Sequence, residues 1–212
     1  MQKINFKIIF SEESELQRIL WTKGRLEWYT NHNYNVSKLI LPKDVTPEKL
    51  AALSEEEISE AVKKEFDPTI YQKHVQSIDS LLQKYLDILA EKFSAIDIEV
   101  LPNIEIRLTR YGMAGSYNIP NVAIVNISNF YDVGLIRNIL HESIHLHVQP
   151  LIYKYGVDQW QKEVIVDGLF EKFFPDLFKK QTYPSDMSVV QNIFNSQYPN
   201  LDSIMSNVII SS

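Results

Sequence analysis

Two histidines and a glutamate, His141, Glu142 and His145, form the pattern H-E-x-x-H, the segment of the sequence best suited to chemistry. On an α-helix, residues four positions apart project from one face, so both imidazoles can reach a single metal ion. The glutamate between them lies close enough to act on a water molecule at that metal. If the segment is helical, it therefore predicts a metal site with His141 and His145 as ligands and Glu142 beside them.

The residues around this motif favour a central helix that faces a cleft. Apolar residues recur three and four positions apart on two sides of such a helix, and the histidines fall between these sides. The two sides carry Val133, Ile136, Leu140 and Ile144, and Leu135, Ile139 and Leu146. We expect the helix to run from Tyr131 and to kink or end near Val148, because Pro150 lacks a backbone donor and would clash with the carbonyl of Leu146.

A second helix is predicted downstream, where a further ligand is needed. The chain has no cysteine, so histidine and carboxylate side chains must hold any such metal. Asp158 and Gln161 are typical of the N-cap and the third position of a new helix. On that helix Glu163 and Asp167 lie four positions apart and share a face. Glu163 follows His145 closely enough for the second helix to return to the first.

The two motifs together, H-E-x-x-H and a later helix with E-x-x-x-D, resemble those of the gluzincin family of zinc metallopeptidases. The resemblance implies a zincin-like fold and one zinc ion per chain, held by His141, His145 and Glu163. It implies that Glu142 is the general base and that Asp167 orients a ligand imidazole, that of His141. The resemblance also implies that the substrate is a peptide or a protein.

The resemblance extends over residues 104–167 and does not specify a substrate class. Lys162 precedes Glu163 where thermolysin-like members usually have asparagine, and the G-x-M-E-N signature of the aminopeptidase branch is absent. The metzincin pattern is excluded, because it needs glycine and histidine three and six residues after the second motif histidine. This chain has Val148 and Leu151 there.

Several other residues have side chains suited to the same site. Glu171 is the alternative third ligand, and His147 is expected to be a packing residue because it projects away from the ligand face. A transition-state stabiliser has no recognisable motif here, and a tyrosine hydroxyl is one group that can serve. We favour Tyr117, which lies beside an expected edge strand. The other tyrosines considered are Tyr131, Tyr153, Tyr155 and Tyr183.

The order of periodic segments, helices followed by strands and then helices, predicts an α+β fold. Residues 1–212 are expected to form a single zincin-like metallopeptidase domain. It would have a mainly helical part at 1–95, strands and zinc-site helices at 96–177, and a C-terminal tail at 178–212. We expect a small mixed sheet with an edge strand, packed on the central motif helix.

Alternation of apolar and polar residues predicts strands at 4–10, 104–109 and 122–127. Residues 113–118 are expected to form the edge strand, along which an extended substrate would lie. Helix starts are expected at four places: Ser14 with Gln17, Thr46-Pro47, Ser54 with Glu57, and Asp67-Pro68. The last of these begins the clearest apolar stripe: Tyr71, Val75, Ile78, Leu82, Tyr85, Leu89 and Phe93. The tail shows only a weak helical signal, around residues 189–194.

Composition limits the remaining possibilities. The chain has 212 residues with 45% hydrophobic and 23% charged residues, enough apolar side chains for a sizeable core. Its formal net charge of −6 argues against nucleic acid or an anionic membrane as the main partner. No apolar run resembles a signal peptide or a membrane span, so we expect a cytoplasmic protein. The sequence predicts no oligomeric state.

We therefore expect a zinc-dependent hydrolase, specifically a peptidase. One alternative is a non-catalytic zinc-binding or interaction protein that retains a zincin fold. The other is a metal-free helical scaffold in which the motif is coincidental.

Overall fold

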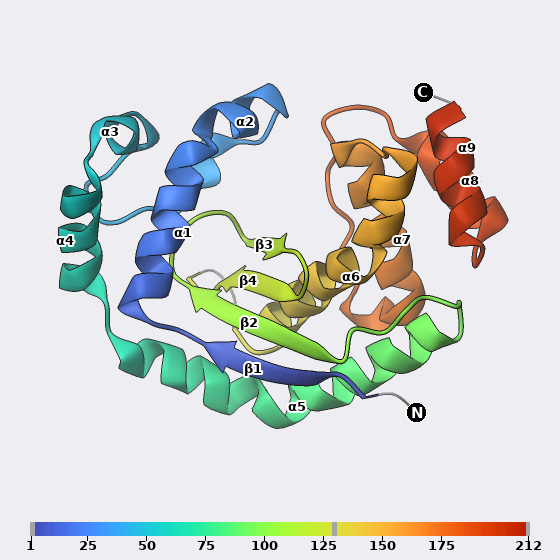
Figure 1. The fold of residues 1–212 in the computed structure, drawn as a ribbon, viewed down its shortest axis with the longest axis horizontal. Helices are drawn as coiled ribbons and strands as arrows, with labels where there is room; N and C mark the ends of the chain where they lie inside the picture. Colours follow the sequence, from blue (N-terminus) through green and yellow to red (C-terminus); the bar gives the residue numbers. More distant parts are fainter. Residues whose placement is uncertain (1–2, 129–130, 211–212) are drawn as a thin grey trace.

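The computed structural model describes residues 3–128 and 131–210, which form an α+β fold around one four-stranded mixed sheet (Figure 1). The predicted α+β class and small mixed sheet are thus confirmed, while the outermost residues of the predicted 1–212 domain lie outside the described ranges. The elements are β1 (Asn5–Ile9), α1 (Glu12–Gly24), α2 (Leu26–Asn31), η1 (Val36–Lys38), α3 (Pro47–Ala52), α4 (Glu55–Glu65), α5 (Pro68–Ser94), β2 (Asn103–Thr109), β3 (Gly115–Asn118), β4 (Val122–Asn126), α6 (Val133–Tyr155), α7 (Gln159–Phe173), η2 (Pro175–Leu177), α8 (Ser188–Gln197) and α9 (Leu201–Ile210).

The sheet has the strand order β1-β2-β4-β3, with β1, β2 and β4 parallel and β3 antiparallel to β4. The alternation in β2 holds, because Ile104, Ile106 and Leu108 are all buried. β3 lies at one end of the strand order, so the expectation of an edge strand within residues 113–118 is confirmed. An edge strand presents unpaired backbone groups to whatever lies beside it.

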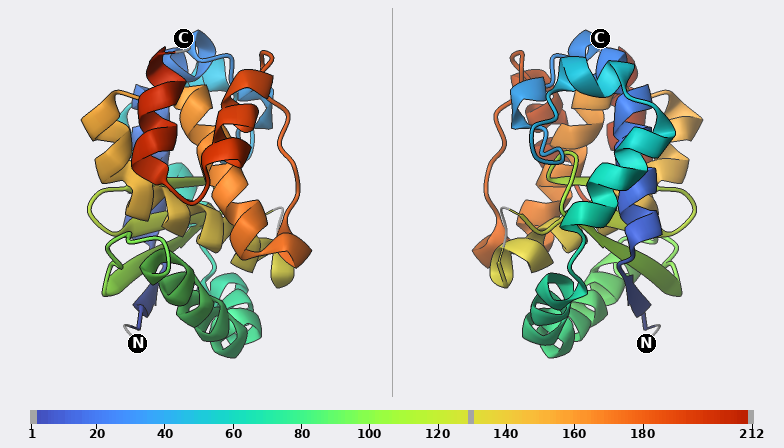
Figure 2. Two further views of the ribbon diagram at one scale, coloured as in Figure 1. Left: turned by 90° about the vertical axis from the view of Figure 1, so that its right-hand side faces the viewer. Right: turned by 90° about the vertical axis from the view of Figure 1, so that its left-hand side faces the viewer.

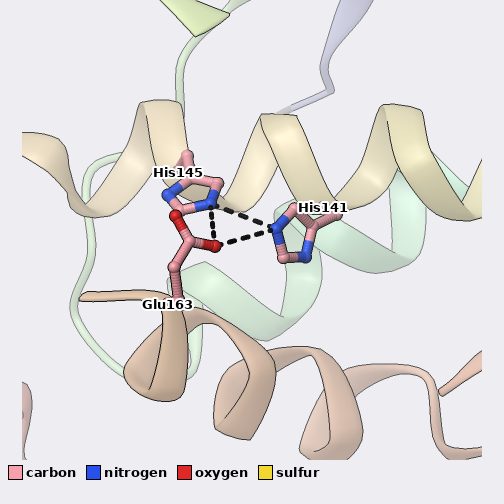
Figure 3. A group of neighbouring side chains, drawn as sticks. All are labelled: His141, His145 and Glu163. Carbon is pink, nitrogen blue, oxygen red and sulfur yellow. Dashed lines mark hydrogen bonds and ion pairs between the residues drawn. The ribbon is translucent and has the colours of Figure 1, made fainter. Parts of the chain in front are cut away.

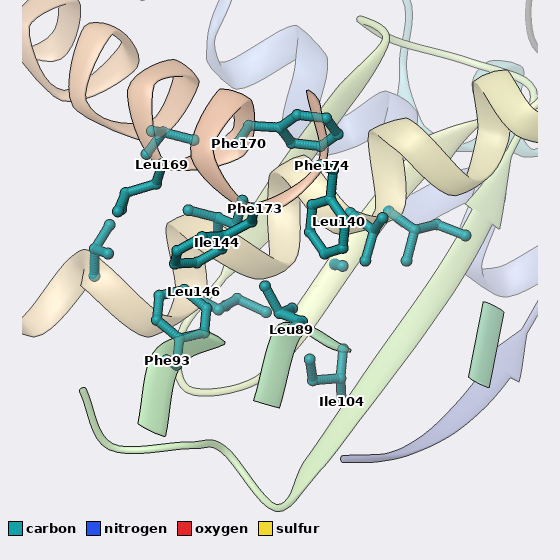
Figure 4. Packing of buried hydrophobic residues seen from close by; sticks show 14 of the residues in the cluster. Leu89, Phe93, Ile104, Leu140, Ile144, Leu146, Leu169, Phe170, Phe173 and Phe174 are labelled. Carbon is teal, nitrogen blue, oxygen red and sulfur yellow. The ribbon is translucent and has the colours of Figure 1, made fainter. Parts of the chain in front are cut away.

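Helix α6 occupies the centre of the molecule. It packs against β4 and β3 of the sheet and also against α5, α7 and α9. The main hydrophobic core lies where these elements meet, with Phe93 of α5, Ile144 of α6 and Phe173 of α7 among its members (Figure 4). A second, smaller core joins α1, α3 and α4 through Ile19, Leu50 and Ile58. The motif helix is therefore surrounded by apolar contacts that hold it in place.

Most predicted helix starts are confirmed. Thr46, Ser54 and Asp67 each accept a backbone hydrogen bond as N-caps, with proline following Thr46 and Asp67. The first helix is an exception, because it begins at Glu12 and is capped by Ser11. Ser11 and Ser14 exchange side chain–backbone hydrogen bonds, so the predicted cap residue is instead the third residue of the helix.

Of the two outcomes expected near Val148, a kink or an end of the motif helix, the end is wrong. Helix α6 continues through Pro150 to Tyr155 and ends at Gly156, which adopts the left-handed conformation. Pro150 is exposed, whereas Val148 and Ile152 on either side of it are buried. Burial of these flanking residues offsets the hydrogen bond that proline removes.

The tail contains more structure than its weak helical signal indicates. Helix α8 covers the expected segment, and α9 follows it without having been predicted (Figure 2). The two helices pack on each other, α8 on α7 and α9 on α6. They contribute Phe194, Ile204 and Met205 to the main core.

Candidate metal centre

The side chains of His141, His145 and Glu163 converge on one point between α6 and α7 (Figure 3). The two Nε2 atoms are 3.1 Å apart. The Oε2 atom of Glu163 lies 3.5 Å from Nε2 of His141 and 3.3 Å from Nε2 of His145. The structure therefore brings together the three ligands that the resemblance implies.

The donor set and its spacing fit a zinc ion. Two imidazole nitrogens and a carboxylate oxygen are the three protein ligands found in one class of catalytic zinc sites. With metal–ligand bonds of about 2.0–2.1 Å, the ligands of a tetrahedral ion are about 3.3 Å apart. The three observed separations lie close to that value, so the side chains could bind a metal with small movements.

Local sequence explains how the two helices meet at this point. Gly156 ends α6 in the left-handed conformation, which glycine adopts without steric cost. Asp158 then caps α7, and Gln161 completes a reciprocal capping box. This short connection places α7 against α6, and Glu163 lies in the second turn of α7, opposite the histidines.

The surroundings shift the pKa values of the three candidate ligands in different directions. Burial lowers the pKa of His145 to about 4, so this imidazole is neutral, the form that binds metals. Burial opposes the charge of His141 too, but Glu163, Glu142 and Asp167 outweigh it and raise the pKa of His141 to about 9. For Glu163, the two histidines overcome the effect of burial and hold its pKa well below the ordinary value. The surroundings thus favour the ionised form of Glu163, the cationic form of His141 and the neutral form of His145.

Glu142 lies in the same buried region without being part of the ligand group. It is 7% exposed, and burial raises the pKa of its carboxyl to about 7, partly opposed by the charge of His141. A proton acceptor works best when its pKa is near the operating pH. Glu142 has the electrostatic properties of a general base.

A glycine of the edge strand makes room for this carboxylate. A Cβ atom added to Gly115 of β3 would overlap Oε1 of Glu142 and approach its Cδ to 2.8 Å. The Glu142 side chain therefore packs directly on the strand backbone, and a larger residue at position 115 would displace it.

For the general-base role expected of Glu142 from the sequence, Gly115→Ala should reduce hydrolysis by at least about 10-fold, because small displacements of such a group carry large costs. Zinc content and melting temperature should change little, since the clash falls on the end of a flexible side chain. Metal analysis, thermal unfolding and peptide cleavage check this. Gly24→Ala is the control, because nothing lies near its added Cβ. Equal activity of both variants would contradict the packing argument.

Asp167 lies beside His141 on the side away from the ligand point. Its Oδ1 atom is 3.7 Å from Nδ1 of His141, slightly beyond hydrogen-bond distance. Gln181 donates to Oδ1 at 3.0 Å, and the Tyr183 hydroxyl donates to Oδ2 at 2.5 Å. The carboxylate is thus held in place next to the ring that it is predicted to orient.

We expect Asp167→Ala to weaken zinc affinity by roughly 10–100-fold, the usual cost of losing a carboxylate that orients a ligand imidazole. Competition with a chelator measures the affinity. Asp176→Ala, at an exposed position in η2, should leave it unchanged. Wild-type affinity in the Asp167 variant would contradict the predicted role.

Tyr117 of β3 also lies at the candidate centre. Its ring stacks on His145 with centroids 4.7 Å apart. Its hydroxyl donates to Oε1 of Gln149 at 2.5 Å and accepts from Nζ of Lys162 at 3.0 Å. The proton of the Tyr117 hydroxyl is thus donated to Gln149. To act as the transition-state stabiliser expected from the sequence, the hydroxyl would have to donate to the substrate instead.

The second oxygen of Glu163 is held by its neighbours on α7. Gln159 donates to Oε1 of Glu163 at 2.8 Å and to the hydroxyl of Tyr34 at 2.7 Å. Because Oε1 is occupied in this way, Oε2 is the oxygen that faces the histidines.

A cavity of about 750 Å³ opens over the ligand group. One wall is β3, and another comes from Trp21 of α1, Trp28 of α2 and Tyr34 of the loop that follows α2. Tyr34 stacks on Trp160 at 4.9 Å, so the N-terminal region reaches across to the start of α7. Residues 1–95, for which the motifs predicted no role, therefore help to form the candidate site.

The remaining candidates lie apart from the ligand point. Glu171 is exposed and is not in the ligand group of the described residues. His147 stacks on Phe93 and accepts from the Leu101 backbone N–H at 3.2 Å, consistent with a packing residue. Tyr183 contacts Asp167, and Tyr153 lies at the cavity wall; Tyr131 and Tyr155 do not line the cavity.

Sequence patterns missed residues that complete the site through long-range contacts. Arg18 of α1 is buried and donates to Ser116 Oγ at 2.7 Å, bracing the edge strand. Gln149 accepts a hydrogen bond from the Tyr117 hydroxyl, and Gln159 donates one to Glu163. Only Lys162 gave a signal, as a departure from the asparagine usual in thermolysin-like members.

Within residues 3–128 and 131–210, no helix is both long enough and apolar enough to cross a membrane. Comparison of the whole chain with protein-family models, curated proteins and solved structures finds no match. The geometry of the candidate metal centre is therefore the basis for any functional conclusion.

Proposed function

We propose that the chain is a zinc-dependent hydrolase, specifically a peptidase of gluzincin type with a zincin-like fold, acting in the cytoplasm. The observation that carries the proposal is the convergence of His141, His145 and Glu163 within a cavity that also contains Glu142. Three ligands leave a fourth position for water or substrate, which is the arrangement of catalytic rather than structural zinc sites.

In the proposed reaction, zinc, Glu142 and the edge strand β3 have separate roles. Zinc, when bound, polarises a carbonyl and lowers the pKa of water at the site to about 7. Glu142 accepts a proton from the attacking water and delivers it to the amine as the carbon–nitrogen bond breaks. Because β3 is an edge strand beside this carboxylate, an extended peptide can pair with its backbone and present a carbonyl to the site.

The experiment that tests the proposal combines metal analysis with a cleavage assay. The purified protein is incubated with zinc, dialysed and analysed for zinc, iron, manganese and cobalt, because two histidines and a carboxylate also suit iron. A peptide library is then tested with and without a chelator, with His141→Ala as control. We expect one zinc per chain and cleavage that the chelator stops.

Two results would contradict the proposal. Protein that takes up no metal would indicate that the motif is coincidental. Protein that holds zinc and cleaves no peptide would favour the non-catalytic zinc-binding alternative.

A further inference from the structure

A buried ammonium group lies beside the candidate metal centre, and the peptidase mechanism above gives it no role. Lys162 is 8% exposed. Its Nζ atom donates to Oε1 of Gln159 at 2.8 Å and to the hydroxyl of Tyr117 at 3.0 Å. Placing an ammonium in so buried a position costs free energy unless its surroundings compensate for lost water.

The ammonium retains one N–H for a ligand. Its Nζ atom also lies 3.6 Å from Oε1 of Glu163. That distance is an ion-pair contact and is too long for a hydrogen bond. Gln159 and Tyr117 therefore fix the position of the cation without using all of its donors.

The position of Lys162 places this donor near the reacting groups. It directly precedes Glu163 on α7, and its side chain lines the cavity that contains Glu142 and the histidines. Its hydrogen-bond partner Tyr117 stacks on His145. The ammonium thus lies on the cavity wall beside the candidate metal ligands.

Attack of water on a peptide carbonyl moves negative charge onto the carbonyl oxygen. A donor that is already oriented, in a site with little water, stabilises that charge strongly because it needs no reorganisation. The Tyr117 hydroxyl is less suited to this task, because its proton is donated to Gln149. A lysine cation with a remaining N–H meets the requirement.

We propose that Lys162 is a catalytic residue that donates a hydrogen bond to the oxyanion formed during hydrolysis, with Tyr117 as its positioning residue. The inference rests on the proposed function and names a group that the motifs do not supply. In a purely structural role, Lys162 would only hold Gln159, and through it Glu163, in position, so zinc should be lost when the side chain can no longer donate a hydrogen bond.

Lys162→Met and Lys162→Arg separate these roles. Lys172→Met is the control, because it removes the same charge from an exposed position on the same helix. Zinc content is measured first. Calorimetry then gives the affinity of each zinc-loaded protein for methylphosphonate, a tetrahedral anion, and peptide cleavage gives kcat and KM.

We expect Lys162→Met to keep its zinc, to bind methylphosphonate at least about 10-fold more weakly, and to lose roughly 100–1,000-fold in kcat with little change in KM. Lys162→Arg should recover much of the phosphonate affinity, and Lys172→Met should match the wild type. Tyr117→Phe should have a smaller effect on both quantities than Lys162→Met.

Unchanged phosphonate affinity and kcat in Lys162→Met would overturn the inference while leaving the proposed function intact. Loss of zinc from Lys162→Met alone would assign the residue a structural role and also overturn it. Wild-type protein without zinc would overturn the proposed function, and this inference with it.

Discussion

Replacing Glu142 with glutamine should abolish hydrolysis while leaving the zinc content at the wild-type level. The amide keeps the shape of the side chain but cannot accept a proton from water. Loss of a general base typically costs about 10²–10⁴-fold in rate. Because Glu142 is outside the ligand group, its replacement removes no metal donor.

Thermal unfolding provides the control for this variant. Glu142 is buried and burial raises its pKa, so its ionised form is disfavoured in the folded protein. A neutral glutamine should therefore leave the melting temperature unchanged or raise it. An active Glu142→Gln variant with full zinc occupancy would show that another group accepts the proton.

Replacing Glu163 with alanine should remove zinc from the protein. Two imidazoles would then be the only protein donors left, whereas catalytic zinc sites use three. Removing the carboxylate also leaves the His141 imidazolium without its hydrogen-bonded partner. We expect loss of bound zinc after dialysis, measured by elemental analysis, and loss of any chelator-sensitive cleavage.

Glu171→Ala is the matched control for this experiment. Glu171 lies on the same helix two turns later, was the alternative ligand from sequence, and is exposed. It should keep one zinc per chain and full activity. If Glu163→Ala retained zinc and Glu171→Ala lost it, the ligand assignment would be wrong.

Local patterns predicted the secondary structure well where neighbouring residues determine it. The caps at Thr46, Ser54 and Asp67 depend on contacts within one helical turn, so they are visible in sequence. The cap at Ser11 was missed because Ser11 and Ser14 are both suitable cap residues, and in the structure Ser11 is the N-cap with Ser14 as its capping-box partner. Pro150 was misjudged because its cost is offset by burial of residues that only the fold brings together.

The metal ligands were predictable because helix geometry couples them to spacing. His141 and His145 share a face whatever surrounds the helix, and Glu163 and Asp167 do so on the next helix. The two faces meet because of the turn at Gly156 and the apolar packing of α6 against α7. The sequence indicates the turn and the apolar residues, but not how the two helices pack.

Periodicity, capping and spacing predict the α+β class, the edge strand, and the residue types and faces that could hold a metal. The packing of Gly115 on Glu142, the hydrogen bonds of Lys162 to Tyr117 and Gln159, and the part of the N-terminal helices in the cavity become known only from the fold. The difference lies in the sequence separation of the residues involved. Periodicity and capping arise from residues a few positions apart, whereas these contacts join segments that only the folded core brings within hydrogen-bond or packing distance.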